Sequence, residues 1–243
     1  MFYFLKEGIS MKITYWSDYA CPYCYIGEAR LKKVLASAPE LRDVEVEMKS
    51  FQLDPTAGEH AAGDTQTRFA RKYGISFAAA GRQIETISRM GREEGLDFNY
   101  ATTLFTNTMD AHRLTKLARS EGGEEAEQQT AERLFAAYFS ENRELADRDL
   151  LQKIGAECGL APEKVAHMLN SDDFRDDVLC DERDAARYGI HAVPFFLIGS
   201  HPVSGAMSVE DLRWTIEKAL AENGGHLCAQ GAACGPDGCT FGD

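Results

Sequence analysis

Two cysteines separated by two residues, Cys21 and Cys24, lie where a strand is expected to pass into a helix. Residues 11–15 are rich in β-branched and aromatic side chains, and apolar residues recur at helical spacing over residues 26–35. Because two residues separate the cysteines, their sulfurs meet across one helical turn and can form and break a disulfide. Cys21 falls at the helix N-terminus, where free N–H groups and the helix dipole favour a thiolate, and Pro22 suits the first helical position. The pattern predicts thiol–disulfide exchange, with Cys21 attacking and Cys24 resolving.

The same pair of cysteines has two other interpretations, half of a zinc site and a structural disulfide. A zinc site usually needs a second pair of ligands at short spacing, and the sequence contains no second Cys-x-x-Cys. The position of the pair between a strand and a helix is the one that redox chemistry requires. We therefore predict a redox-active disulfide and no metal ion.

The charge and composition of the chain exclude several classes of partner. Its net charge is -13 over 243 residues, and an acidic surface repels both nucleic acid and anionic membranes. No apolar run is long enough to predict a transmembrane helix, and the N-terminus lacks the basic region and cleavage site of a secretory signal. We therefore expect a cytoplasmic protein. Seven cysteines is an odd number, so at least one thiol is free or pairs between chains.

The predicted elements run in the order strand, helix, strand, a long helical block, two strands and a helix. Residues 44–51 alternate apolar and polar side chains, which predicts a second strand parallel to the first. After the helical block, the pattern predicts strands over 190–198 and 202–204 and a helix over 209–222. This order is that of an α/β thioredoxin fold (βαβ…ββα) with a large all-α insertion. The expected parts are a thioredoxin-like domain at 1–55 and 189–223, a helical insertion domain at 56–188 and a Cys-rich tail at 224–243 with little regular structure.

Within the helical block we expect separate helices over residues 106–121 and 131–140, with an acidic turn at 121–125 between them. Ser171 is a predicted N-cap for a helix that runs to about Tyr188.

Three further residues of this part of the chain carry structural expectations. Gly189 is a predicted stop for the helix that ends near Tyr188. Cys158 and Cys180 lie in helical patterns beside apolar neighbours, and we expect both to be small buried hydrophobic residues.

A proline opens the apolar stretch that follows the helical block. Pro194 has no backbone N–H to donate, so it belongs at a strand start or in a special turn, and an X-Pro bond can be cis. A simple strand-entry proline is one interpretation. With the cysteine pair upstream, we predict instead a cis Val193–Pro194 bond that faces Cys21 and Cys24. In thioredoxin-type folds such a proline leaves backbone groups free to pair with an extended substrate and blocks metal capture by the thiols.

Several segments together resemble the DsbA-like thiol:disulfide oxidoreductases, in particular the FrnE-type branch. The similar segments are Cys21-Pro22-Tyr23-Cys24, residues 107–113, residues 189–196 and Ser204-Gly205-Ala206, and the match spans about residues 11–222. Related families are the 2-hydroxychromene-2-carboxylate isomerases and the kappa-class glutathione transferases, in which serine replaces the first cysteine. Because this chain keeps both cysteines, the resemblance implies redox chemistry rather than conjugation or isomerisation of a small compound.

The predicted catalytic residues are Cys21, Cys24 and Pro194. We predict substrate-binding roles for five neighbours of the motifs: Pro22, Tyr23, Val193, Trp16 and His112. His112 has two interpretations, a hydrogen-bonded helix histidine near the interdomain cleft, or an imidazole that lines the cleft and stabilises the Cys21 thiolate. Asp18 precedes the motif as a candidate turn or cap residue.

The C-terminal tail holds three more cysteines, Cys228, Cys234 and Cys239. A Gly-Pro-Asp-Gly sequence between Cys234 and Cys239 favours a turn that brings their sulfurs together. One interpretation is a second redox pair that exchanges electrons with Cys21–Cys24 through a flexible arm. The others are a zinc site that includes His226, and a disordered tail whose thiols pair by chance.

The sequence therefore predicts an enzyme, a thiol:disulfide oxidoreductase or isomerase that acts on protein and peptide thiols and disulfides. Its redox-active disulfide serves in place of a cofactor, with glutathione as a candidate co-substrate. One alternative is a glutathione-dependent isomerase or transferase acting on a small aromatic compound. The other is a metal-binding or redox-sensing protein that uses the tail cysteines.

Overall fold

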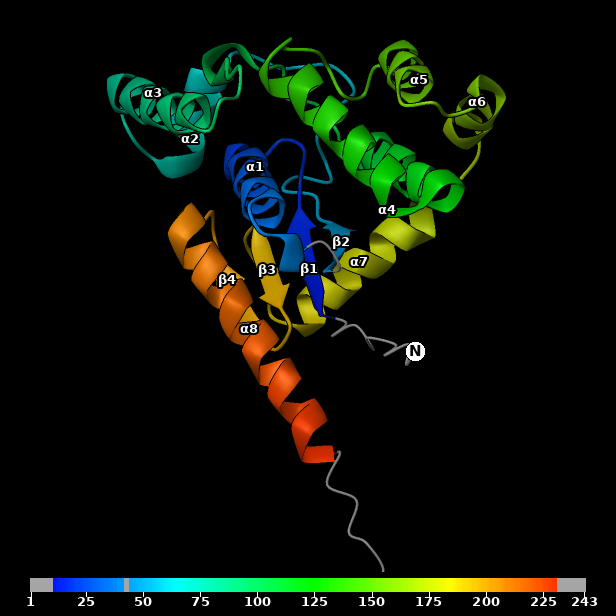
Figure 1. Ribbon diagram of the computed structural model, residues 1–243. Coiled ribbons are helices and arrows are strands. Elements are labelled where there is room, and N and C mark those ends of the chain that lie inside the picture. Colours follow the sequence, from blue (N-terminus) through cyan, green and yellow to red (C-terminus); the bar gives the residue numbers. More distant parts are fainter. Residues whose placement is uncertain (1–10, 42–43, 231–243) are drawn as a thin grey trace, which may run out of the picture.

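A four-stranded sheet lies at the centre of the molecule, which the computed structural model describes for residues 11–41 and 44–230 (Figure 1). Its strands are β1 (Lys12–Ser17), β2 (Glu45–Ser50), β3 (Phe195–Ile198) and β4 (His201–Ser204). They lie in the order β2-β1-β3-β4, with β1 parallel to β2 and antiparallel to β3. Strands β3 and β4 form an antiparallel hairpin. The predicted parallel pairing across the first helix and the predicted hairpin are both confirmed.

Helices cover both faces of this sheet. On one face lie α1 (Pro22–Ala36) and α8 (Val209–Gln230), and there Tyr15 stacks on Phe196 with ring centroids 5.6 Å apart. On the other face lies α7 (Arg175–Arg187). After the exposed Lys12, every residue of β1 is buried, because helices cover both faces of the strand, and its burial does not alternate as it would in a half-exposed strand.

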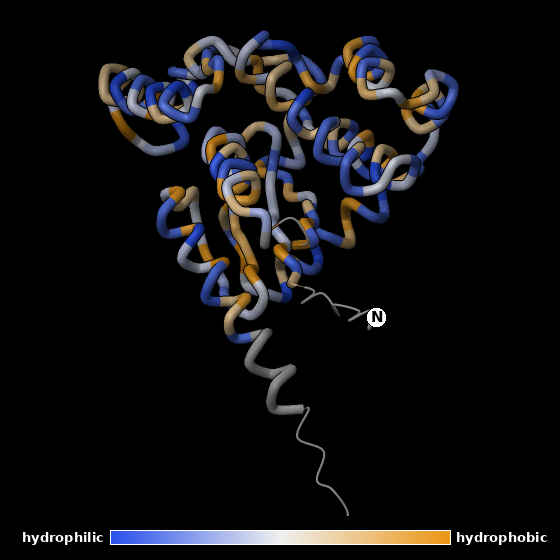
Figure 2. Tube along the Cα trace, viewed as in Figure 1, coloured by the Kyte–Doolittle hydropathy of each residue, from blue (hydrophilic) through white to orange (hydrophobic). Residues whose placement is uncertain are grey.

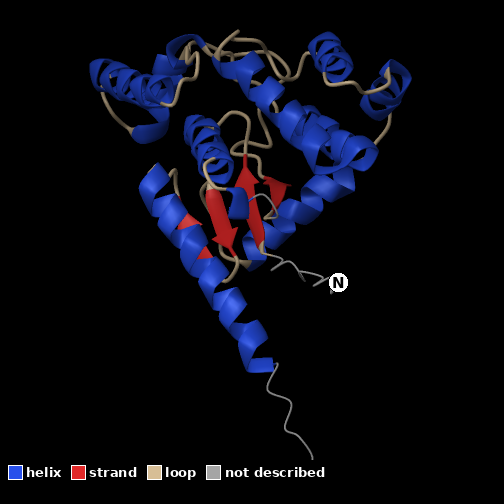
Figure 3. Ribbon diagram, viewed as in Figure 1, coloured by secondary structure: helices blue, strands red, loops and turns tan. Residues whose placement is uncertain are grey.

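Five α-helices form an arch over the end of the sheet at which β1 ends (Figure 1). Figure 3 shows that helix dominates everywhere outside the small sheet, and Figure 2 shows hydrophilic and hydrophobic residues alternating along these helices, as amphipathic packing requires. The five are α2 (Thr65–Tyr73), α3 (Phe77–Glu93), α4 (Met109–Phe139), α5 (Arg148–Glu157) and α6 (Pro162–Asn170).

A group of charged side chains ties α1 to the helical arch. Arg30 Nε lies 2.7 Å from Glu94 Oε1, just after α3, and Lys33 Nζ lies 2.6 Å from the other carboxylate oxygen. Arg30 Nη1 also donates to the carbonyl oxygens of Ala206 and Met207 at 3.1 and 2.9 Å. These contacts fix α1, and the cysteine motif at its N-terminus, between α3 and the turn before α8.

The two helices predicted over 106–121 and 131–140 are the two parts of α4, which breaks at Gly122 and Gly123 inside the predicted turn at 121–125. The chain kinks at Gly123, whose φ of 69° is one that residues with a side chain rarely adopt. The acidic stretch stays helical on the far side of the kink, where Gln128 Nε2 donates to Glu124 Oε1 at 2.9 Å. Such i,i+4 pairs stabilise a helix, so the second part of α4 starts soon after the break, and the predicted start at residue 131 is wrong.

The prediction that Ser171 caps α7 is also wrong. Ser171 follows the end of α6, and its Oγ accepts a hydrogen bond from the N–H of Asp173 at 3.2 Å. After this turn α7 starts beyond Phe174, whose φ is 61°. Gly189 does follow the end of α7 as predicted, with its N–H bonded to the carbonyl O of Ala186 at 3.1 Å.

The strand predicted over 190–198 is shorter in the structure and begins at Phe195. The N–H of Ile190 bonds back to the carbonyl O of Ala185 at 2.8 Å, which completes the end of α7. The chain then turns through Val193 and Pro194 before it can join the sheet, so the first part of the apolar stretch forms a loop.

The last helix is longer than predicted. Helix α8 runs to Gln230, so the expectation of little regular structure from residue 224 is wrong for residues 224–230. Cys234 and Cys239, the predicted second redox pair, lie outside the described residues. No helix in the described ranges is long and apolar enough to cross a membrane.

Cys180 is exposed, contrary to the prediction that it is buried. The reason is the orientation of α7, which buries Val178, Asp181 and Ala185 and turns Cys180 toward solvent. Cys158, which follows α5, is only half-buried.

Candidate active site

Cys21 occupies the N-cap of α1, as the sequence predicts, with φ −94° and ψ 114°, and Pro22 is the first helical residue. The N–H of Cys21 donates to the carbonyl O of Asp18 at 3.0 Å, which closes the turn between β1 and α1. Its thiol is 4% exposed and donates to the carbonyl O of Val193 at 3.4 Å. The free N–H groups at the start of α1 favour negative charge near this sulfur.

Cys24 lies one turn further along α1 and is 1% exposed. Burial raises the pKa of the Cys24 thiol well above its ordinary value, and the hydrogen bond with Cys21 raises it further. Both cysteines are free thiols in this structure. The two sulfurs therefore differ in environment: Cys21 lies at the helix end, and Cys24 lies behind it and stays protonated. This asymmetry suits attack by the first and resolution by the second.

Pro194 lies against the motif. The Val193–Pro194 bond is cis, as predicted, and Pro194 is buried. The carbonyl O of Pro194 accepts a hydrogen bond of 2.8 Å from the N–H of Gly205, which joins the proline loop to the end of β4. On the other side, a Cβ at Gly27 would lie 3.3 Å from the Phe196 ring and 3.4 Å from Pro194. The glycine thus lets α1 approach the proline loop closely.

His112 lies beneath the turn between β1 and α1. Its side chain is fully buried, with Nε2 3.5 Å from Asp18 Oδ1 and its ring centroid 4.8 Å from that of Tyr19. Neither ring nitrogen has a hydrogen-bond partner among the described residues, so the interpretation as a hydrogen-bonded helix histidine is wrong. His112 contacts Asp18 and Tyr19, and its influence on Cys21 stays a prediction.

Asp18 has a larger part in the geometry of the site than the sequence suggests. Its carboxylate is buried and accepts backbone N–H groups from Ala20 at 3.3 Å and from Leu53 at 2.7 Å. Its carbonyl O holds the N–H of Cys21. Asp18 therefore fixes the turn that carries Cys21 and joins it to the chain that leaves β2.

Trp16 is not part of the cleft, although a substrate-binding role was predicted for it. Its side chain is 1% exposed and lies on the α7 face of the sheet. Its Nε1 donates to the carbonyl O of Asp181 at 3.1 Å, and its ring contacts Tyr188 and Phe195. In this structure Trp16 attaches α7 to the sheet and offers no surface to a substrate.

We call four aromatic side chains near the motif the aromatic wall: Tyr23, Phe69, Tyr73 and Tyr100. Burial raises the pKa of Tyr23, and the nearby Tyr73 and Cys21 raise it further. Burial likewise raises the pKa of Tyr100, with Cys21 among the other causes. Phe69 joins the two groups, with ring centroids 4.5 Å from Tyr73 and 6.4 Å from Tyr100. Of the four, only Tyr23 was predicted from the sequence.

Glu28 of α1 is another residue of this region that the sequence did not single out. Burial and the nearby Glu132 raise the pKa of Glu28 to about 8, and the Tyr15 hydroxyl donates to its Oε2 at 3.4 Å. Glu28 is therefore mostly protonated at neutral pH. Its position four residues after Cys24, on the inward side of α1, is the sequence signal that could have identified it.

We expect the stability of the protein to fall as the pH rises from about 5 to about 8, because of Glu28. The folded chain keeps a proton on Glu28 up to about pH 8, whereas the unfolded chain releases it near 4.5. The stabilisation that Glu28 contributes is thus complete below its pKa in the unfolded chain. It is lost as the pH rises through its pKa in the folded chain. Glu28→Gln should remove this slope, so its free energy of unfolding relative to the wild type should rise by about 3.5 kcal/mol between pH 5 and pH 8, measured by urea unfolding.

Glu85→Gln is the matched control for this measurement. Glu85 is exposed on α3 and pairs with Arg92, and its replacement should leave the slope of the wild type in place. Equal slopes for the wild type and Glu28→Gln would show that Glu28 titrates as an ordinary carboxyl.

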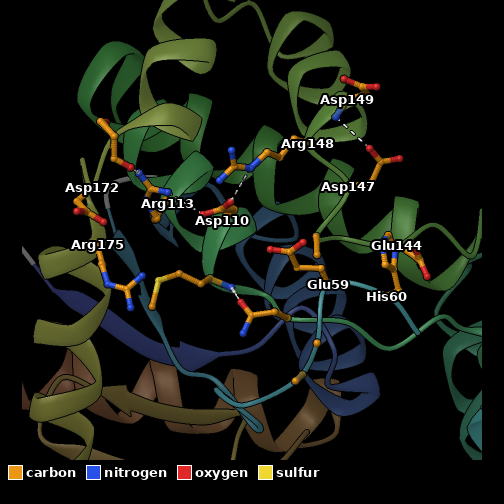
Figure 4. A pocket seen from close by; sticks show the side chains of 16 residues that line it. Glu59, His60, Asp110, Arg113, Glu144, Asp147, Arg148, Asp149, Asp172 and Arg175 are labelled. Carbon is orange, nitrogen blue, oxygen red and sulfur yellow. Dashed lines mark hydrogen bonds and ion pairs between the residues drawn. The ribbon is translucent and has the colours of Figure 1, made fainter. Parts of the chain in front are cut away.

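A cavity of about 710 Å³ opens elsewhere, at the starts of α4, α5 and α7 (Figure 4). Asp110 lies there between Arg113 and Arg148, at N–O distances of 2.7 and 3.8 Å. Arg113 also donates to the carbonyl O of Asp173 at 2.7 Å and of Ser171 at 2.6 Å, so its donors are used within the protein. Neither thiol of the motif lines this cavity. Within the described ranges, no three His, Cys, Asp or Glu side chains are placed to hold a metal ion.

Comparison with known proteins gives consistent results at three levels of similarity. Residues 12–217 match the family model of the DSBA-like thioredoxin domain. A crystal structure of a probable DsbA oxidoreductase, SCO1869 from Streptomyces coelicolor, has a TM-score of 0.81 at 31% identity, covering 96% of this chain and 100% of that one. The uncharacterized protein YwbO of Bacillus subtilis (strain 168) is 26% identical over an alignment of 224 residues. The alignment covers 88% of this chain and 98% of YwbO.

A more distant likeness concerns the fold alone. The structure of a 2-hydroxychromene-2-carboxylate isomerase has a TM-score of 0.64 at 16% identity, covering 91% of this chain and 98% of that one.

Proposed function

The chain belongs to the DSBA-like thioredoxin-domain family, and from this premise we propose that it is a thiol:disulfide oxidoreductase acting on protein and peptide disulfides. One observation carries the proposal, the unequal environment of two adjacent thiols. Cys21 lies at the N-terminus of α1 against the carbonyl O of Val193, and Cys24 lies behind it with a raised pKa. Two-step disulfide exchange needs an attacking thiol and a resolving thiol, and one turn of helix supplies both here.

In the reducing direction the reaction has two steps. The Cys21 thiolate attacks one sulfur of the substrate disulfide, the substrate S–S bond breaks, and the departing sulfur takes a proton from solvent. Cys24 then gives up its proton and attacks the Cys21 sulfur of the mixed disulfide. The second substrate thiol leaves, two electrons have passed to the substrate, and Cys21 and Cys24 are joined. Reversal of the same steps donates a disulfide to a substrate dithiol.

The proline loop supports an extended polypeptide as the substrate. No acceptor among the described residues bonds the N–H of Val193, and the carbonyl O of Val193 faces the Cys21 sulfur. A substrate segment could pair with this backbone edge as an added strand while its sulfur reaches Cys21. Tyr23, 39% exposed, would lie beside the same segment.

The two thiols carry the electrons themselves, so the proposed reaction needs no metal and no organic cofactor. Glutathione would serve as the co-substrate that resets the pair, and the cytoplasm is the compartment that we propose for it. The exchange of electrons with Cys234 and Cys239 also stays a prediction. Comparing the redox potential of Cys21–Cys24 with and without Cys234→Ser/Cys239→Ser would test it.

Cys24→Ala should convert the protein into a trap for its substrates. Without the resolving thiol, the mixed disulfide on Cys21 persists and accumulates, because only an external thiol can release it. Incubation with a disulfide-containing polypeptide, followed by non-reducing electrophoresis and mass spectrometry, should place nearly all adducts on Cys21.

Cys180 provides the control for this experiment, because it is an exposed thiol far along the chain. The variant Cys24→Ala/Cys180→Ser should form as much mixed disulfide with the substrate as Cys24→Ala does. The variant Cys21→Ala/Cys24→Ala should form none. Adducts that map to Cys180, or no adducts at all, would contradict the proposed function.

A further inference from the structure

One stretch of this acidic chain is basic. Residues 65–84 contain Arg68, Arg71, Lys72 and Arg82 and no acidic residue, although the net charge of the chain is -13. The stretch comprises α2 and the first half of α3, which lie side by side above α1 in Figure 1. The positive charge is therefore gathered on the helices next to the candidate active site.

The cations of α2 lack ion pairs in the part of the chain that the structure describes, where the Lys72 ammonium lies over the Tyr73 ring at 5.8 Å. No carboxylate in the described part of the chain forms an ion pair with Arg68, Arg71 or Lys72, whereas cations elsewhere, such as Arg30 and Lys116, are paired. Arg71 and Lys72 are exposed. A positive surface without ion pairs attracts negatively charged groups, which the rest of this acidic protein repels.

The same surface presents exposed aromatic rings. Tyr73, at the end of α2, is 55% exposed, and Phe77, at the start of α3, is 58% exposed. Gly74, with φ 64°, ends α2 between them and allows the sharp turn that displays both rings. Tyr73 belongs to the aromatic wall, with its ring centroid 4.5 Å from that of Phe69. Arg68 of the same helix lies over the Phe105 ring at 3.6 Å.

We propose that α2 and the start of α3 are a docking surface for an acidic segment of the substrate polypeptide, with Arg71 and Lys72 binding its carboxylates and Tyr73 and Phe77 its apolar side chains. The inference rests on the proposed function and names the class of substrate that it favours. Charge and position carry it: the cations without ion pairs and the exposed rings lie together on α2 and the start of α3, beside α1 and its cysteine motif, and α2 is about 13 Å long. That length and the two exposed rings suit a polypeptide better than glutathione, which is a tripeptide without an aromatic group.

The test compares peptides that differ only in the charge beside a disulfide-bonded cysteine. One peptide has two aspartates there, the second two asparagines and the third two lysines. Each rate of exchange with the reduced protein is divided by the rate of the same protein with a small uncharged disulfide. The wild type should prefer the aspartate peptide to the asparagine peptide by about fivefold at low salt, and the preference should shrink as salt screens it.

Two double variants locate the effect. Arg71→Gln/Lys72→Gln should bring the ratio of aspartate to asparagine peptide close to one. Arg175→Gln/Arg183→Gln is the matched control, because it removes two exposed cations of α7 that also lack an ion pair among the described residues. The control should keep the ratio of the wild type.

Each other outcome overturns a stated part of the proposal. Equal rates for the three peptides with the wild type, or an equal loss in both double variants, would show that α2 is not a docking surface. If oxidised glutathione depends on Arg71 and Lys72 as strongly as the aspartate peptide does, the surface binds any carboxylate and the polypeptide class is wrong. If the wild type fails to react even with the small uncharged disulfide, the proposed function itself falls, and the inference with it.

Discussion

Replacing Cys21 by serine is expected to lower disulfide exchange by about 10³-fold or more, the largest effect of any single substitution in the site. A serine hydroxyl cannot form the mixed disulfide, and Cys24 has its sulfur buried behind the helix end. The fold should survive, because serine is a favourable N-cap residue and Cys21 already occupies the N-cap of α1. The rate of insulin reduction, with glutathione as the reductant, is the measurement.

The same variant separates the proposed oxidoreductase from a glutathione-dependent isomerase or transferase. Those relatives resemble this chain in fold but have serine in place of the first cysteine, so Cys21→Ser creates their pattern at this position. If the chain belonged to their class, Cys21→Ser would retain conjugation or isomerisation of a small aromatic compound, measured beside the insulin assay. Cys180→Ser, which removes an exposed thiol of α7, should match the wild type in both assays.

The parts of the site that the sequence predicts are those set by local rules. Pro22 places the start of α1, and with it Cys21 at the N-cap, through the geometry of one helical turn. The cis Val193–Pro194 bond follows from a proline at the head of an apolar strand in a chain that also has the cysteine motif. The strand pairing follows from the alternation of β2 and from the short connection between β3 and β4.

The parts that the sequence does not predict depend on contacts between distant segments. Phe69, Tyr73 and Tyr100 come together near the motif only because α2 and the segment after α3 fold over α1, and no local pattern encodes that approach. The prediction that Trp16 lines the substrate cleft placed this side chain on the wrong face of the sheet for a related reason. Strand β1 is buried on both faces, so the alternation of its side chains does not say which of them faces the cleft.

Asp181→Ala is expected to destabilise the protein by about 3 kcal/mol, which corresponds to a fall in Tm of about 9 °C for a chain of this size. Asp181 of α7 is buried, and its Oδ2 lies 2.6 Å from Lys116 Nζ of α4 and accepts the N–H of Ser50 at 2.9 Å. Its Oδ1 lies 3.3 Å from Lys49 Nζ of β2. Alanine would leave two largely buried ammonium groups and a backbone N–H without this partner, and unpaired buried charge is costly. Thermal unfolding followed by circular dichroism measures the effect.

Asp184→Ala on the same helix shows whether burial is the cause. Asp184 pairs with Lys49 at 3.0 Å but its side chain is 26% exposed, so solvent can replace it and the loss should stay below about 1 kcal/mol. A loss for Asp184→Ala as large as that for Asp181→Ala would contradict the argument from burial. Below its lowered Tm, Asp181→Ala should still exchange disulfides at the wild-type rate, because the Asp181 carboxylate binds Lys49, Lys116 and Ser50, which hold α7 and α4 to the sheet, and forms no bond with either thiol. A matching loss of activity at low temperature would mean instead that the attachment of α7 also positions the proline loop, which follows it in the chain.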